Sequence, residues 1–102
     1  MGEDYDLESF VAEGVRRAQE RGYHPTVFLQ MRERHGTAGA IRRLVRSGDI
    51  QSGLTRLAEL GLSEWSVEAA VLRFPDEFSE QERWAAEWRL SQARREAERR
   101  SG

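Results

Sequence analysis

Apolar residues recur at intervals of three and four along almost the whole chain, and this spacing limits the possible folds more than any other feature. Such spacing places apolar side chains on one face of a helix. No segment alternates apolar and polar residues as a half-buried strand does, and the chain has only two prolines, Pro25 and Pro75. The sequence therefore predicts an all-α fold. With 102 residues the chain fits one domain, a compact bundle of five or six short helices.

Glycine, proline and capping residues divide this pattern into six predicted helices. Gly22 and Gly36 are suited to helix C-termini, and Pro25 to a first helical position. Thr37 and Ser63 are predicted N-caps. The predicted helices span residues 7–21, 25–36, 37–47, 50–60, 63–74 and 79–102.

Two of these helices carry specific expectations about burial. In the second, Val27, Phe28 and Met31 share the face that is expected to point inward. The fifth is apolar on both sides, with Leu72 on one side and Val71 on the other. A helix that is apolar all round is normally buried, so we expect the fifth helix at the centre of the domain.

The last helix has the clearest start signal in the chain. Ser79 and Glu82 have the spacing of a capping box, in which each side chain binds the other residue's backbone N–H. Beyond Leu90 the chain has no large apolar residue. The sequence therefore predicts one helical domain over residues 1–90 and a polar, Arg-rich helical tail over 91–102 that protrudes and frays.

The last helix is also apolar on two opposite sides, and one domain surface covers only one of them fully. Trp84 and Trp88 lie on one side, and Ala86, Leu90 and Ala93 on the other. Aromatic residues at helical spacing favour burial of both tryptophans in the core. In that case the small residues on the opposite side permit close helix–helix contact, as in a homodimer. If the tryptophans are uncovered, they form the candidate binding face, because Trp and Arg dominate interface hot spots.

Charge is arranged in blocks along the chain. Its 16 basic residues are all Arg, and the formal net charge is only -2, which excludes a wholly basic histone-like binder. Residues 1–15 carry a net charge of -5, residues 16–56 carry +6, residues 57–82 carry -6, and residues 83–102 carry +3. The second block is a candidate basic surface for phosphate or for an acidic protein.

Within this block Arg42, Arg43 and Arg46 share the solvent side of the predicted third helix. Segments 37–47 and 50–60, joined by a predicted turn at Gly48 and Asp49, suggest a helix–turn–helix. A nucleic-acid-binding regulator is thus one interpretation of this face. The other is an ordinary solvated face whose Arg residues pair with the acidic blocks of the same domain, and the few base-reading side chains on 50–60 favour it.

Catalytic chemistry has little support in the sequence. The absence of Cys excludes disulfides, thiol nucleophiles and Cys-ligated zinc. His24 and His35 lack the spacing of a zinc helix, and the acids of residues 76–82 match no calcium loop. Glu68 lies among apolar neighbours, where a raised pKa would suit acid–base catalysis. An ion pair with one of the many Arg residues, or an exposed strip along an otherwise buried helix, is favoured instead. We therefore predict no enzyme activity, no catalytic residue, no cofactor and no metal.

The segment GLTRLAELGLSEWSVEAAVL, residues 53–72, resembles a segment in a family of small, mostly uncharacterised bacterial all-helical proteins. Leu54 and Ala58 depart from the Phe and Trp usual in that family. The resemblance, which extends loosely over residues 23–90, implies a shared helical fold and transfers no activity. The matching positions are Gly53, Thr55, Leu57, Glu59, Gly61, Val67, Glu68, Ala69, Val71 and Leu72.

The function predicted from these features is binding without catalysis. We expect a small regulatory or adaptor protein that recognises another macromolecule, in the first place a protein. A phage-encoded or defence-associated inhibitor fits this size and blocked charge. A homodimer and a nucleic-acid partner are the alternatives. No apolar run reaches the length of a membrane span and no signal peptide is recognisable, so the expected location is the cytoplasm. The candidate partner-binding residues are Trp84, Trp88, Leu90, Arg42, Arg43 and Arg46.

Overall fold

The computed structural model describes residues 6–46 and 52–101, and within these ranges it contains five α-helices, two single-turn 3₁₀ helices and no strand. The predicted all-α class is confirmed. The elements follow one another as α1 (Leu7–Glu20), α2 (Thr26–Arg46), α3 (Ser52–Glu59), η1 (Ser63–Trp65), α4 (Val67–Arg73), η2 (Pro75–Glu77) and α5 (Glu80–Ser101).

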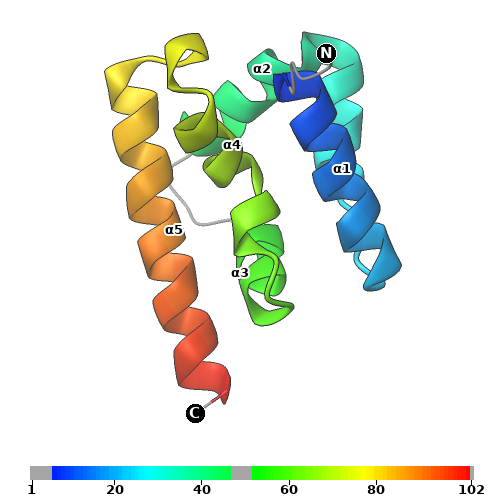
Figure 1. Ribbon diagram of the computed structural model, residues 1–102, viewed down its shortest axis with the longest axis vertical. Helices are drawn as coiled ribbons and strands as arrows, with labels where there is room; N and C mark the ends of the chain where they lie inside the picture. The colour runs from blue at the N-terminus through cyan, green and yellow to red at the C-terminus, as the bar shows by residue number, and fades with distance from the viewer. Residues whose placement is uncertain (1–5, 47–51, 102) are drawn as a thin grey trace.

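The short helix α4 occupies the middle of the molecule, with α5 on one side and α1 on the other (Figure 1). It packs against α5, α1 and α2, and its Ala70 and Val71 are fully buried. The central position expected for the fifth predicted helix is thus observed. The expectation that this helix is buried all round is wrong for Leu72, which is 39% exposed, because α4 is covered on three sides only.

The main core lies where α1, α2 and α4 meet. Gly14 lets α1 approach η1 closely, since a Cβ at this position would lie 2.7 Å from the Trp65 carbonyl oxygen. On the same side the rings of Phe10 and Trp65 stack with centroids 4.9 Å apart. Most of the apolar residues at three- and four-residue spacing along α1 are buried, as the helical pattern requires. Other buried members of this core are Leu7, Val11, Phe28, Ile41, Val45, Val71 and Phe78.

A sharp bend divides α2 at Gly36. This residue has φ 78° and ψ 169°, a conformation that glycine adopts without the steric cost of a Cβ. The predicted helix end at Gly36 is therefore confirmed. Beyond it, the buried Thr37 hydroxyl donates to Glu8 of α1 at 2.9 Å and accepts from Arg32 at 3.1 Å, which ties the bend to α1. Before it, the inward position predicted for Val27 is wrong, because this side chain is 66% exposed.

The predicted helix over 63–74 is interrupted at Ser66, and its predicted N-cap is one turn too early. Ser66 has extended backbone angles, and its Oγ accepts from the Ala69 N–H at 3.1 Å. Ser66 is thus the N-cap of α4, while Ser63 begins the separate turn η1. Trp65, the residue before this break, packs on Phe10 of α1.

A second, smaller core joins α3 to α5. It consists of Leu54, Leu90 and Ala93, all buried. Further along α5, the guanidinium of Arg100 lies 2.8 Å from the Glu59 carboxylate on α3. The segment predicted as a protruding tail over 91–102 therefore contacts α3 through Ala93 and Arg100. Ala93 is small enough to let α3 approach, and the segment is helical through Ser101. The turn predicted at Gly48 and Asp49 lies outside the described residues.

Candidate protein-binding surface

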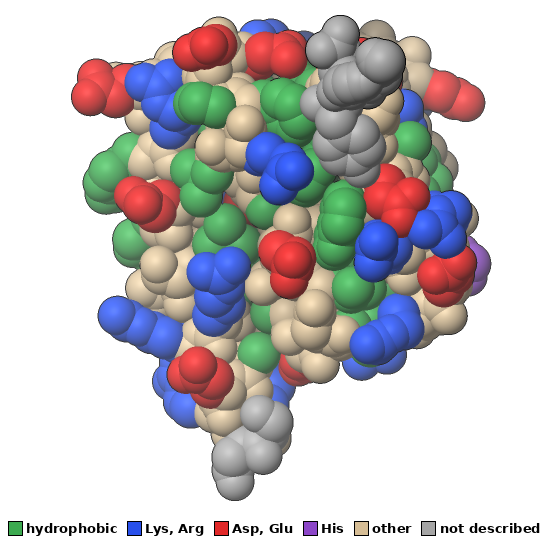
Figure 2. Space-filling view, in the orientation of Figure 1, with side chains coloured by type: hydrophobic (Ala, Val, Ile, Leu, Met, Phe, Trp, Pro, Cys, Tyr) green, Lys and Arg blue, Asp and Glu red, His purple; other side chains and the backbone are tan. Residues whose placement is uncertain are grey.

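The two tryptophans of α5 point away from the domain. Trp84 is 67% exposed and Trp88 is 45% exposed, whereas Ala86 and Ala93, on the opposite side of the helix, are fully buried. The expected burial of both tryptophans in the core is wrong. The physical reason is the close approach of α3 and α4, which small side chains allow and indole rings would prevent. Figure 2 shows hydrophobic side chains reaching the surface over the N-terminal half of α5.

Leu90 belongs to the protein's own core and is withdrawn as a partner-binding residue. It is only 4% exposed and packs with Leu54 of α3. The Ala86–Leu90–Ala93 side, offered as a homodimer surface if the tryptophans were core, is covered by α3 and α4. The side of α5 that carries the two tryptophans is thus the accessible one.

A shallow depression lies between Trp84 and Trp88 on α5 and Val45 and Arg46 on α2. We call this surface, including both tryptophans, the Trp face. Val45 is buried at its floor, and the Arg46 side chain at its edge is 69% exposed. The Trp face therefore combines large accessible aromatic area with a guanidinium, the composition typical of interface hot spots.

Glu82 fixes the basic edge of this face and also starts α5. Its Oε1 accepts from the Ser79 N–H at 2.9 Å and the Ser79 Oγ accepts from the Glu82 N–H at 3.1 Å, so the predicted capping box is confirmed. Its Oε2 lies 2.8 Å from Arg46, and Arg42 lies 3.7 Å from Oε1. Burial of Glu82 favours its neutral form, but the Ser79 N–H and the guanidinium of Arg46 outweigh this and hold its pKa below the usual value.

The Arg residues of the predicted basic surface divide into two groups. Arg42 and Arg46 pair with Glu82, and Arg42 also donates to the Glu77 carbonyl at 2.8 Å. Arg43 is exposed. Most of the charge is thus used within the domain, as the alternative of intramolecular pairing predicts. In the described ranges α3 packs on α5 and η1 and has few contacts with α2, which differs from a helix–turn–helix pair.

The buried carboxylate at Glu68 has a partner that the sequence interpretation missed. Glu68 and Arg89 are each 2% exposed, and Arg89 Nε donates to Glu68 Oε2 at 3.0 Å. Burial raises the pKa of Glu68, and the Arg89 guanidinium offsets part of that rise. The favoured reading of Glu68 as an ion-paired residue is confirmed. Arg89 lies on the same apolar stripe of α5 as Ala86 and Ala93. A charged residue within an apolar stripe is the sequence signal that could have predicted a buried ion pair.

The remaining candidates for chemistry do not come together. His24 and His35 are both exposed and lie on separate stretches of the chain. Throughout residues 6–46 and 52–101, no three His, Asp or Glu side chains group closely enough to hold a metal ion. Among the acids of residues 76–82, Glu82 is already bound in the helix cap and by Arg42 and Arg46.

Comparisons with protein-family models, with curated proteins and with solved structures gave no match for this chain. None of the described helices has both the length and the apolar character needed to cross a membrane. Within the segment 53–72, the fold explains why two positions carry the residues they do. A Cβ at Gly53 would lie 2.2 Å from the Tyr23 hydroxyl oxygen, and Glu68 is the buried partner of Arg89.

Proposed function

We propose that this protein is a non-enzymatic binding module that recognises another protein through the Trp face. The observation that carries the proposal is the exposure of Trp84 and Trp88 on the side of α5 opposite the core. Both indole rings lie outside the two buried clusters that hold the domain together. Trp side chains are among the strongest interface anchors when a partner covers them.

The partner that suits this face has an apolar groove bordered by acidic residues. Arg46 at one edge of the face is already balanced by Glu82. The exposed Arg43 is on the same half of α2, and the exposed Arg95 follows Trp88 by two helical turns. Positive charge at a rim speeds encounter with a negative partner, while the apolar centre determines how long the complex lasts. We assign this module a regulatory or adaptor role, such as that of an inhibitor, as part of the same proposal.

The test is affinity capture from the native host with three tagged proteins. They are the wild type, Trp84→Ala/Trp88→Ala, and the matched control Leu72→Ala, which removes a partly exposed apolar side chain from α4. Lysates are treated with nuclease, and the beads are washed at two salt concentrations. We expect one stoichiometric protein with wild type and control, and at least a hundredfold less with the Trp variant, because a pair of anchors contributes about 2 kcal/mol or more each. Circular dichroism confirms that all three proteins are folded.

Three outcomes would overturn the proposal. Equal capture of the same protein by the Trp variant would place the interface elsewhere. Capture that disappears with nuclease and falls steeply with salt would favour nucleic acid and the Arg residues of α2. Sedimentation of the purified protein as a dimer that the Trp variant dissociates would show that a second copy of this chain covers the face.

A further inference from the structure

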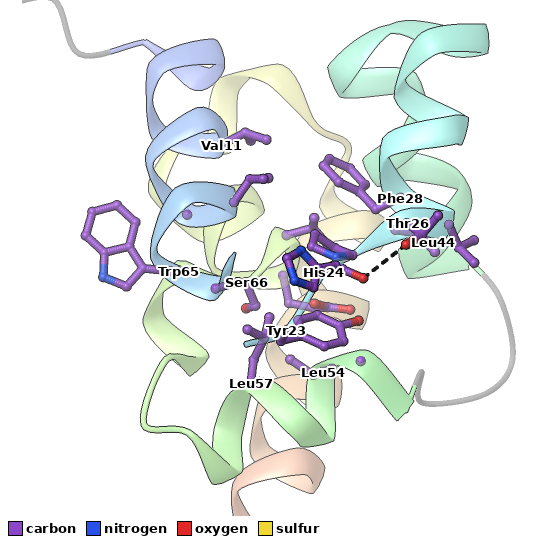
Figure 3. A pocket seen from close by; sticks show the side chains of 18 residues that line it. Val11, Tyr23, His24, Thr26, Phe28, Leu44, Leu54, Leu57, Trp65 and Ser66 are labelled. Carbon is purple, nitrogen blue, oxygen red and sulfur yellow. Dashed lines mark hydrogen bonds between the residues drawn. The ribbon is translucent and has the colours of Figure 1, made fainter. Parts of the chain in front are cut away.

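A separate cavity of about 270 Å³ lies among α1, the start of α2, α3 and α4. Figure 3 shows Val11 and Phe28 pointing into it from α1 and α2, and Leu54 and Leu57 bordering it from α3. The Trp65 ring points away from the cavity, although its residue contributes to the wall. Most of the lining is therefore aliphatic or aromatic, as in ligand pockets.

The Tyr23 hydroxyl is a polar group placed in this apolar setting. Tyr23 is half-buried above α3, and burial raises its pKa. Its hydroxyl oxygen occupies the space where a side chain at position 53 would otherwise lie, since a Cβ on Gly53 would be only 2.2 Å away. Within the described ranges this hydroxyl has no hydrogen-bond partner. A half-buried hydroxyl facing an apolar cavity is well placed to bind a polar atom of a ligand.

Apart from the exposed His24 imidazole, the other polar side chains in the wall are already engaged. The Ser66 hydroxyl donates to the Ser63 carbonyl at 2.7 Å, and the Thr26 hydroxyl donates to the His24 carbonyl at 3.3 Å. Glu68 is paired with the buried Arg89 of α5, and this guanidinium compensates its charge. These pairings leave the cavity without an uncompensated buried charge, and a charged ligand would lose its hydration there without a counter-ion.

We propose that this cavity binds a small, neutral, mostly apolar molecule that makes one hydrogen bond to the Tyr23 hydroxyl. The volume sets the size of the ligand. A dry cavity of about 150 Å³ accommodates benzene, so the cavity here suits a molecule with on the order of ten non-hydrogen atoms, such as a fused two-ring compound. The site is independent of the Trp face, since the two surfaces share no side chain.

The experiment uses indole and indene as probes, because they share size and shape and only indole carries an N–H donor. Each is titrated into the full-length ¹⁵N-labelled protein while backbone amide resonances are followed. We expect saturable shifts clustered around Tyr23, Gly53 and Leu57, with indole binding about fivefold more tightly than indene, the value of one neutral hydrogen bond. In Tyr23→Phe, indole affinity falls to that of indene, whereas indene affinity is unchanged.

Trp84→Ala serves as the control variant and is expected to bind both probes as the wild type does. Leu57→Trp fills the cavity and is expected to abolish both shifts. The wild-type titration already locates the site if that variant does not fold. The proposal is overturned if neither probe gives saturable shifts, or if the shifts cluster on α5 around Trp84 and Trp88. Equal binding of indole by the wild type and Tyr23→Phe would overturn the assigned role of the hydroxyl.

Discussion

Removal of Arg89 from the buried ion pair should cost this protein a large part of its stability. Glu68 and Arg89 are each 2% exposed, with a nitrogen–oxygen distance of 3.0 Å. The substitution Arg89→Met keeps most of the side-chain volume and removes the guanidinium. The Glu68 carboxylate then stays between α4 and α5 without its counter-charge.

The expected loss is about 3–5 kcal/mol at pH 7, because breaking a buried pair leaves one charge uncompensated. A domain of this size has a total stability of roughly 5–15 kcal/mol, so the variant stays folded or lies close to its unfolding threshold. The double variant Glu68→Leu/Arg89→Met removes both charges. It should regain at least about 2 kcal/mol of the loss, since apolar replacements of a buried pair are often neutral or stabilising.

The pH dependence gives an independent check. Burial raises the pKa of Glu68 above its ordinary value of 4.5, even with Arg89 present to lower it. An acid with a raised folded pKa keeps its proton better in the folded state, so its stability contribution is fully present below the unfolded pKa and is lost as pH rises through the folded pKa. Loss of Arg89 raises this pKa further. The stability gap between the wild type and Arg89→Met should therefore narrow as pH falls toward 4.5.

Urea unfolding followed by circular dichroism at pH 5 and pH 7 measures these differences. Arg95→Met is the matched control, because Arg95 is exposed on the same helix and should change stability by no more than about 0.5 kcal/mol. The reasoning is refuted if Arg89→Met lies within about 1 kcal/mol of the wild type at pH 7. It is also refuted if the gap does not change with pH, because Glu68 would then not be the group left uncompensated.

Three further substitutions test the packing of α5 and α1 by the same unfolding assay. Trp84→Ala should change the free energy of unfolding by less than about 0.5 kcal/mol, because the ring is exposed. A loss of about 3 kcal/mol would show that the ring is buried in the core. Gly14→Ala gains about 1 kcal/mol of helix propensity. Its Cβ would lie 2.7 Å from the Trp65 carbonyl oxygen, and overpacking of about 1–3 kcal/mol should make the variant less stable overall. A variant more stable than the wild type would contradict this. Ser79→Ala removes one half of the capping box and should cost about 1 kcal/mol; an unchanged midpoint would show that Glu82 alone caps the helix.

Local signals were sufficient for the helices and most of their ends. The spacing from Leu7 to Ala18 predicted α1, Gly36 predicted the bend in α2, and the pair Ser79 and Glu82 predicted the start of α5. Each of these features depends on residues within one or two helical turns of each other. Such short-range interactions can be read from a sequence without knowing what packs against it.

The errors occur where two local solutions were nearly equal. Ser63 and Ser66 are both competent N-caps, and the packing of Trp65 on Phe10 of α1 selects Ser66. Val27 and Phe28 are adjacent apolar residues, and the angle at which α2 meets the core buries only Phe28. In both cases the decision comes from contacts with residues distant in sequence.

The candidate site followed the same division. Periodicity by itself determined that α5 has two apolar sides, and the blocked charges only favoured pairing of Arg residues with acids of the same domain. Only the tertiary structure decided that the Ala86–Leu90–Ala93 side faces inward and that Trp84 and Trp88 face outward. The reason is steric and electrostatic at once. Small residues let α3 and α4 approach closely, and burying that side also brings Arg89 to Glu68, a pairing across 21 residues that no local pattern specifies.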